Sequence, residues 1–197
     1  MNEDQRVAQA QLDLINEVIS NTKARLEQNG GTFLFWGILL TVASAAQFVL
    51  IQMEYYSISY YPYFAALFGW IYTIRKYAVG RKTKTRKSNI LGKAVQSIWI
   101  HVGINAALLG FLLAIELGDH LIPVILLVVS AGVLLSGVII KHRYIFFAGI
   151  FCNLAAYLAF FIPYGFQPLL TSIVYFAVMV VPGYLLIKDY RRRHGTK

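Results

Sequence analysis

The sequence is poor in charged residues. Only 14% of its 197 residues are Asp, Glu, Lys or Arg, whereas soluble domains carry about 25%. Hydrophobic residues make up 58% of the chain, and its mean hydropathy is +0.59. This composition is typical of an integral membrane protein. Because one helical span takes about 20 apolar residues, the length allows about six spans and leaves no room for a soluble catalytic domain.

Residues and motifs that carry chemistry are also scarce. The single cysteine, Cys152, excludes an internal disulfide. The sequence contains no Gly-x-Ser-x-Gly, no His-Glu-x-x-His and no glycine-rich phosphate loop. Only one histidine lies well inside an apolar run, so a bis-histidine haem site is not expected. We therefore expect no enzyme activity, cofactor or bound metal. The enzymatic hypothesis that remains is a carboxylate, thiol or metal site formed in three dimensions, for instance at Glu54, Glu116 and His120.

The apolar runs predict an all-α membrane protein. A transmembrane backbone must satisfy its own hydrogen bonds, and runs without polar alternation do so as helices rather than as a barrel. The fold expected is a six-transmembrane-helix bundle over residues 31–188, preceded by a cytoplasmic amphipathic helix over residues 1–30 and followed by a basic tail over residues 189–197. The six predicted spans are residues 32–53, 58–74, 94–115, 121–140, 144–162 and 169–187.

Positive charge is concentrated in alternate connections, which predicts the orientation. Seven Lys and Arg residues lie in residues 75–87, and others lie in residues 141–143 and 191–193. The opposite connections contain no Lys or Arg. Basic connections stay in the cytoplasm, so both termini are expected there. The net charge of +9 is thus explained by topology, with membrane lipids as the surroundings and no nucleic-acid partner.

An apolar stripe runs along residues 1–30. Its members recur at spacings of four and three, as the face of an amphipathic helix does: Ala8, Leu12, Ile15, Ile19, Thr22 and Leu26. The segment carries five acidic and three basic residues, which makes it poorly suited to an anionic lipid surface. We expect this helix to end at Gly30-Gly31 and to pair with its own copy or with another protein.

A few polar side chains lie inside the predicted spans. His101 and Asn105 are one helical turn apart in the third span, and Gln47 and Asn153 lie in the first and fifth. Intramembrane ionisable groups usually face the bundle and often mark a pathway. The four residues are candidates for a polar path. The structural alternative, which we favour for His101, is a neutral imidazole bonded to a neighbouring helix, with Asn105 acting in the same way.

Two further features concern helix packing. Gly132, Ser136 and Gly137 form a face of small residues in the fourth span, which suits close helix contact. Pro182 predicts a kink in the sixth span. The tyrosine-rich connection at residues 54–63 is interpreted as an interfacial aromatic belt, with a ligand platform as the alternative.

Several short segments resemble one protein family. They are residues 12–23, residues 30–37 (GGTFLFWG), residues 149–153 (GIFCN), Pro163-Tyr164 and residues 181–184 (VPGY). Together they resemble a family of small six-span bacterial membrane proteins of unknown function, common in Bacteroidota. The resemblance implies a bacterial inner membrane and a six-helix bundle, and it implies no active-site residue.

The leading functional hypothesis is a non-enzymatic accessory or regulatory protein that acts through homo- or hetero-assembly. It is motivated by the acidic amphipathic helix and by the absence of catalytic motifs. The alternative is a small-solute or ion channel or transporter, homo-oligomeric, whose path is lined by His101, Asn105, Asn153 and Gln47.

Overall fold

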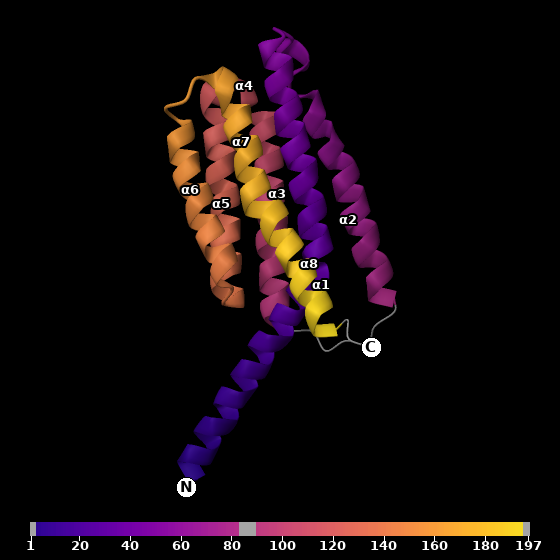
Figure 1. Ribbon diagram of the computed structural model, residues 1–197, viewed down its shortest axis with the longest axis vertical. Helices are drawn as coiled ribbons and strands as arrows, with labels where there is room; N and C mark the ends of the chain where they lie inside the picture. Colours follow the sequence, from indigo (N-terminus) through magenta and orange to yellow (C-terminus); the bar gives the residue numbers. More distant parts are fainter. Residues whose placement is uncertain (1–2, 83–89, 195–197) are drawn as a thin grey trace.

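The protein is an elongated bundle of helices (Figure 1). The computed structural model describes residues 3–82 and 90–194, and every regular element within them is helical. In chain order the elements are α1 (Glu3–Gln52), η1 (Tyr56–Ile58), η2 (Tyr61–Phe64), α2 (Ala65–Lys82), α3 (Ile90–Leu112), α4 (Ala114–Leu117), η3 (Gly118–His120), α5 (Leu121–Ile140), α6 (Arg143–Ala159), η4 (Tyr164–Phe166), α7 (Gln167–Tyr175), η5 (Phe176–Val180) and α8 (Val181–His194). The all-α prediction is confirmed.

Four helical segments of the described chain are long and apolar enough to cross a membrane: Gly30–Gln52, Lys93–Leu112, Ala114–Ile140 and Tyr164–Lys188. They overlap the first, third, fourth and sixth predicted spans. The predicted fifth span corresponds to α6, an apolar helix of 17 residues. The predicted second span, residues 58–74, is displaced. Its first part forms two short 3-10 turns with Pro62 inside the second, and the α-helix begins only at Ala65.

The prediction that a helix ends at Gly30-Gly31 is wrong, because α1 continues for 50 residues from Glu3 to Gln52. The reason is tertiary packing against α8. A Cβ on Gly30 would lie 3.0 Å from Leu186 Cβ, and one on Gly183 would lie 2.8 Å from the Leu34 nitrogen. These glycines allow the two helices to approach closely, so their effect on packing outweighs their tendency to end a helix. The first half of α1 extends away from the bundle (Figure 1).

Two tryptophans, Trp36 and Trp70, join α1, α2 and α3. The Trp36 ring fills the space over Gly69, where a Cβ would lie 2.9 Å from the ring, and Trp36 Nε1 donates to Thr73 Oγ1 at 3.0 Å. Trp70 in turn lies over Gly103 on α3. Each glycine of these two pairs makes room for an indole from the neighbouring helix, so α2 is held to the bundle by large side chains fitted to small ones.

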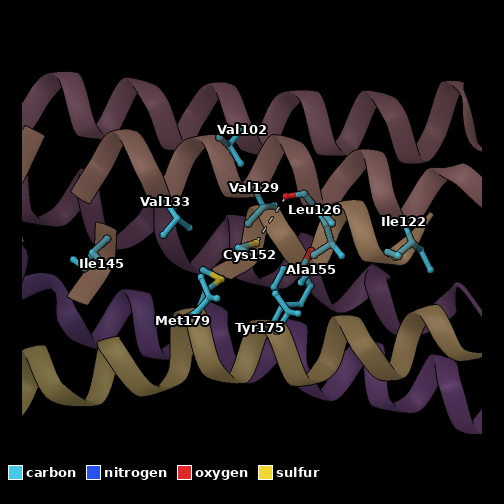
Figure 2. Packing of buried hydrophobic residues seen from close by; sticks show 14 of the residues in the cluster. Val102, Ile122, Leu126, Val129, Val133, Ile145, Cys152, Ala155, Tyr175 and Met179 are labelled. Carbon is cyan, nitrogen blue, oxygen red and sulfur yellow. Dashed lines mark hydrogen bonds between the residues drawn. The ribbon is translucent and has the colours of Figure 1, made fainter. Parts of the chain in front are cut away.

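The core lies between α5, α6 and the α7–η5 segment (Figure 2). Leu126, Val133, Cys152 and Val174 are fully buried there. Figure 2 shows Cys152 directed at α5, where its thiol donates to the Leu126 carbonyl at 3.8 Å. The close packing of these buried side chains contributes much of the stability of the fold through van der Waals contacts.

The last helical stretch widens just before Pro182. Residues 176–180 form a π-helical turn, in which the Val181 N–H donates to the Phe176 carbonyl. Proline has no N–H to donate to the carbonyl four residues earlier, and π-turns are one way in which a helix absorbs such a loss. At this turn the helix lies against α1, because a Cβ on Gly37 would lie 2.9 Å from Met179 Cβ.

Candidate functional site: two polar clusters in the bundle

A buried polar cluster joins α1, η2 and α7. Gln47 has 0% and Gln167 2% of its surface exposed. Tyr63 Oη donates to Gln47 Oε1 at 3.0 Å and lies 3.0 Å from Ser44 Oγ, whose hydroxyl hydrogen completes the chain. From α7, Ser172 Oγ donates to the Thr41 carbonyl at 3.0 Å. We call Thr41, Ser44, Gln47, Tyr63, Gln167 and Ser172 the α1–α7 polar cluster.

The residues next to the two amides meet between α1 and α7, where the rings of Phe48 and Phe166 are 6.1 Å apart. The Ser172–Thr41 hydrogen bond is a second contact between the same two helices. Gln167 Nε2 donates to the Ile162 carbonyl at 3.1 Å. Thr41 Oγ1, Gln47 Nε2 and Gln167 Oε1 are buried without a hydrogen-bond partner among the described residues. The cluster therefore offers a buried amide donor, a buried amide acceptor and a buried hydroxyl, and its six members are all uncharged at neutral pH.

Sequence analysis found Gln47 and missed the rest of the cluster. The signal was present as spacing, because Thr41, Ser44 and Gln47 recur every three residues, and Gln167 and Thr171 are one turn apart. Serine and threonine hydroxyls are so often hydrogen-bonded to their own helix that such spacing alone is weak evidence for a buried polar cluster. Thr171 is an instance, since its hydroxyl donates to the Gln167 carbonyl at 2.9 Å.

Tyrosines lie at the end of the bundle that contains the α1–α7 polar cluster. Tyr164 Oη donates to Tyr60 Oη at 2.8 Å, which links η4 to the connection before α2. Burial and the hydrogen bond to Tyr164 raise the pKa of Tyr60 above its usual value, and burial raises the pKa of Tyr63 to about 12. Both phenols therefore stay protonated through the physiological range and act as hydrogen-bonding groups rather than as acids or bases.

The second cluster lies on the outer face of α3. His101 and Ser97 are exposed, and Asn105 is half-buried beside them. Asn105 Nδ2 donates to the His101 carbonyl at 2.9 Å, within its own helix. We call these three residues the α3 polar stripe. The expectation that His101 and Asn105 face the bundle and bond to neighbouring helices is thus wrong, because the buried face of α3 is formed instead by Val95 and Val102.

Asn153 belongs to a third set of contacts. Its Nδ2 donates to Ser130 Oγ at 3.0 Å and so joins α6 to α5. The four predicted path residues therefore divide among three places: Gln47 with Tyr63, Asn153 with Ser130, and His101 with Asn105 on the outer face of α3. The hydrogen bonds among the described residues do not connect the three places into one path.

The predicted face of small residues lies where α5 contacts α3 and α6. A Cβ on Gly132 would lie 2.7 Å from Val102 Cγ2 on α3, and one on Gly137 would lie 2.6 Å from the Phe146 nitrogen on α6. Ser136 Oγ accepts a hydrogen bond from Trp99 Nε1 at 3.1 Å. The three residues thus let α5 approach helices on two sides.

The predicted assembly helix is the first half of α1. Leu12 is 54% exposed there, beside the exposed Gln11 and Asp13. The side chains of Ile15, Ile19 and Leu26 lie outside the described residues. At the opposite end of the bundle, Glu54, Glu116 and His120 are exposed, and the described residues contain no group of three or more His, Cys, Asp or Glu side chains placed to hold a metal.

Comparisons of the chain with protein-family models, with curated proteins and with solved structures found no match. The resemblance to a six-span bacterial family therefore stays a prediction.

Proposed function

We propose that the protein is a non-enzymatic membrane protein that works by assembly, through the first half of α1. The observation that carries this proposal is that α1 continues without a break from the bundle into a stretch that extends away from it, with Leu12 exposed (Figure 1). A large apolar side chain on such an isolated helix favours association with a second helix.

The spacing of the apolar stripe supports a coiled-coil partner. The intervals 4, 3, 4, 3 and 4 between Ala8 and Leu26 form a heptad pattern. One core position is held by Leu12, Ile19 and Leu26, and the other by Ala8, Ile15 and Thr22. The partner is a helix of a second copy or of another protein. Identifying this partner is the first experiment.

The topology that accompanies this proposal has six spans. To the four apolar segments it adds α2 and α6, which run antiparallel to their chain neighbours (Figure 1). Lys141 and Arg143 between α5 and α6, and Arg191 and Arg192 in α8, then lie at the same end of the bundle as the extended half of α1. The positive-inside rule makes this end cytoplasmic, and the family resemblance suggests a bacterial inner membrane.

The test is the native mass of the full chain in mild detergent, with any bound protein identified. We expect an oligomer or a stoichiometric complex whose native mass falls when Leu12 and Ile19 are both replaced by Asp, because the partner held by α1 is lost. Two charges in a helix–helix core weaken binding at least tenfold by the usual cost of burying charge. The matched control replaces Ala10 and Ala24 by Asp, which adds the same charges on the opposite side of the same helix.

An unchanged mass in the Leu12→Asp, Ile19→Asp chain would contradict this function for α1. The channel alternative receives less support. Its four path residues lie in three separate polar places, and a single copy therefore supplies no continuous polar route along the described bundle.

A further inference from the structure

The α3 polar stripe lies where lipid would be expected. Only 11% of the apolar window in Lys93–Leu112 is buried, against 50% for Ala114–Ile140. His101 lies eight residues after Lys93, or about 12 Å along the helix, so it is well inside the apolar region. An imidazole and an amide at this depth are unfavourable against hydrocarbon and are normally covered by protein.

The side chains around the stripe are apolar and equally exposed. Ile104 and Leu108 have 47% and 49% of their surface exposed and lie on the same face of α3 as His101, and Ile100, 44% exposed, lies at the edge of that face. A polar centre with apolar flanks is the composition of helix–helix contacts in membranes, where hydrogen bonds and close packing drive association.

We propose that α3 forms a contact between two copies of this chain within the membrane, centred on His101 and Asn105. Two copies in one membrane have the same orientation, so each residue of α3 meets its own counterpart at the same depth. A neutral imidazole and an amide each have both a donor and an acceptor, so His101 and Asn105 can pair with identical partners. Self-complementary groups of this kind suit a two-fold interface. This contact is separate from the one proposed for α1.

Cysteine cross-linking in membranes tests the contact directly. The parent chain has one cysteine, Cys152, which is fully buried, so it serves as the blank. In the Ile104→Cys chain we expect an oxidant to give a disulfide-linked dimer, with two thiols losing two electrons and two protons to the oxidant. The matched control is Leu154→Cys on α6, which is 64% exposed on a different face and should give no dimer. Equal cross-linking at both positions would overturn the proposal, as would none at Ile104→Cys.

Substitution of the stripe tests its chemistry. Replacing both His101 and Asn105 by Leu should reduce the Ile104→Cys dimer about fivefold to tenfold, as expected for loss of interhelical hydrogen bonds. Among the described residues His101 has no hydrogen bond to another helix, so the thermal unfolding midpoint of the monomer should stay within a few degrees of the parent. An undiminished dimer would overturn the role of the stripe.

The two assembly proposals can fail separately. We expect the Ile104→Cys dimer to persist when Leu12 and Ile19 are replaced by Asp. A cross-link that disappears with those substitutions would overturn the α3 contact, because association would then depend on α1. A cross-link from Ile104→Cys to a different protein, in native membranes, would also overturn the proposal of a second copy.

Discussion

Tyr63 donates its hydroxyl hydrogen to Gln47 Oε1 at 3.0 Å, and this bond holds the connection before α2 against the last turns of α1. The Tyr63 hydroxyl also lies within hydrogen-bond distance of Ser44 Oγ, so one phenol binds two buried side chains of α1. Gln47 is completely buried and its Nε2 has no partner, which makes the Tyr63 bond the only side-chain hydrogen bond of that amide among the described residues.

Replacing Tyr63 by Phe should therefore destabilise the protein by about 1–3 kcal/mol, the usual cost of leaving a buried polar group unpaired. The measurement is thermal unfolding in mild detergent. Tyr61→Phe is the control, since Tyr61 is 62% exposed and should tolerate the change. Equal unfolding midpoints for the two variants would show that the α1–α7 polar cluster does not stabilise the bundle.

The same bond predicts a pH dependence. The pKa of Tyr63 is raised to about 12, whereas a tyrosine of the unfolded chain ionises near its ordinary value of about 10. Between these values the folded protein holds the proton more tightly than the unfolded chain, so stability is complete below pH 10 and falls as pH rises toward 12. The decrease should be at most about 1.4 kcal/mol per pH unit for this group. The stability difference between parent and Tyr63→Phe should shrink over that range, and a constant difference would contradict the assignment.

Two glycines of α1 should respond in opposite directions to alanine. At Gly31 a Cβ would meet no atom within 4 Å, so Gly31→Ala should stabilise the helix by up to about 1 kcal/mol. At Gly37 a Cβ would lie 2.9 Å from both Met179 Cβ and the Val180 nitrogen, so Gly37→Ala should destabilise by about 1–3 kcal/mol. Thermal unfolding of the pair gives the comparison, and the same sign for both would refute the close approach of α1 to η5.

Thr73 should hold α2 through its hydroxyl. Thr73→Val removes the acceptor for Trp36 Nε1 without much change in shape, and should cost about 1–2 kcal/mol because a half-buried indole N–H loses its partner. Thr73→Ser keeps the hydroxyl and serves as the control. Unfolding followed by tryptophan fluorescence would report both stability and the surroundings of Trp36. A Val variant as stable as the Ser variant would count against this bond.

Helix bounds could be predicted from the sequence where local signals and packing agree. α5 covers residues 121–140 as expected, because Lys141 leaves the helix in the left-handed conformation at φ 53° and its N–H closes the last turn on Gly137. α1 shows the opposite case. Gly30-Gly31 favours a helix end locally, but the contact of Gly30 with Leu186 depends on a helix more than 150 residues away in the chain.

The candidate site was harder to predict because facing direction depends on neighbouring helices. His101 and Asn105 lie one turn apart on α3 as predicted, yet Val95 and Val102 of the same helix form its buried side. Tyr63 was interpreted as part of an interfacial belt, and the structure places its hydroxyl against Gln47 instead. A single sequence contains the spacing of these residues and no information on which face of each helix meets another.

The pairing of α1 with α7 also sets the order in which the protein can complete its structure. Ser172 reaches back across 131 residues to the Thr41 carbonyl, and Gln167 completes the same cluster from just before it. Chains are made at about 5–20 residues per second, so roughly 7–26 seconds pass between synthesis of these two positions. During that interval the hydrogen bond from Ser172 to the Thr41 carbonyl is missing, and only the hydrogen bonds of Tyr63 with Ser44 and Gln47 can form in this cluster. The nascent chain thus depends on its final quarter to shield the polar residues of its first span, and a truncation before Gln167 would leave them exposed to the insertion machinery or to proteolysis.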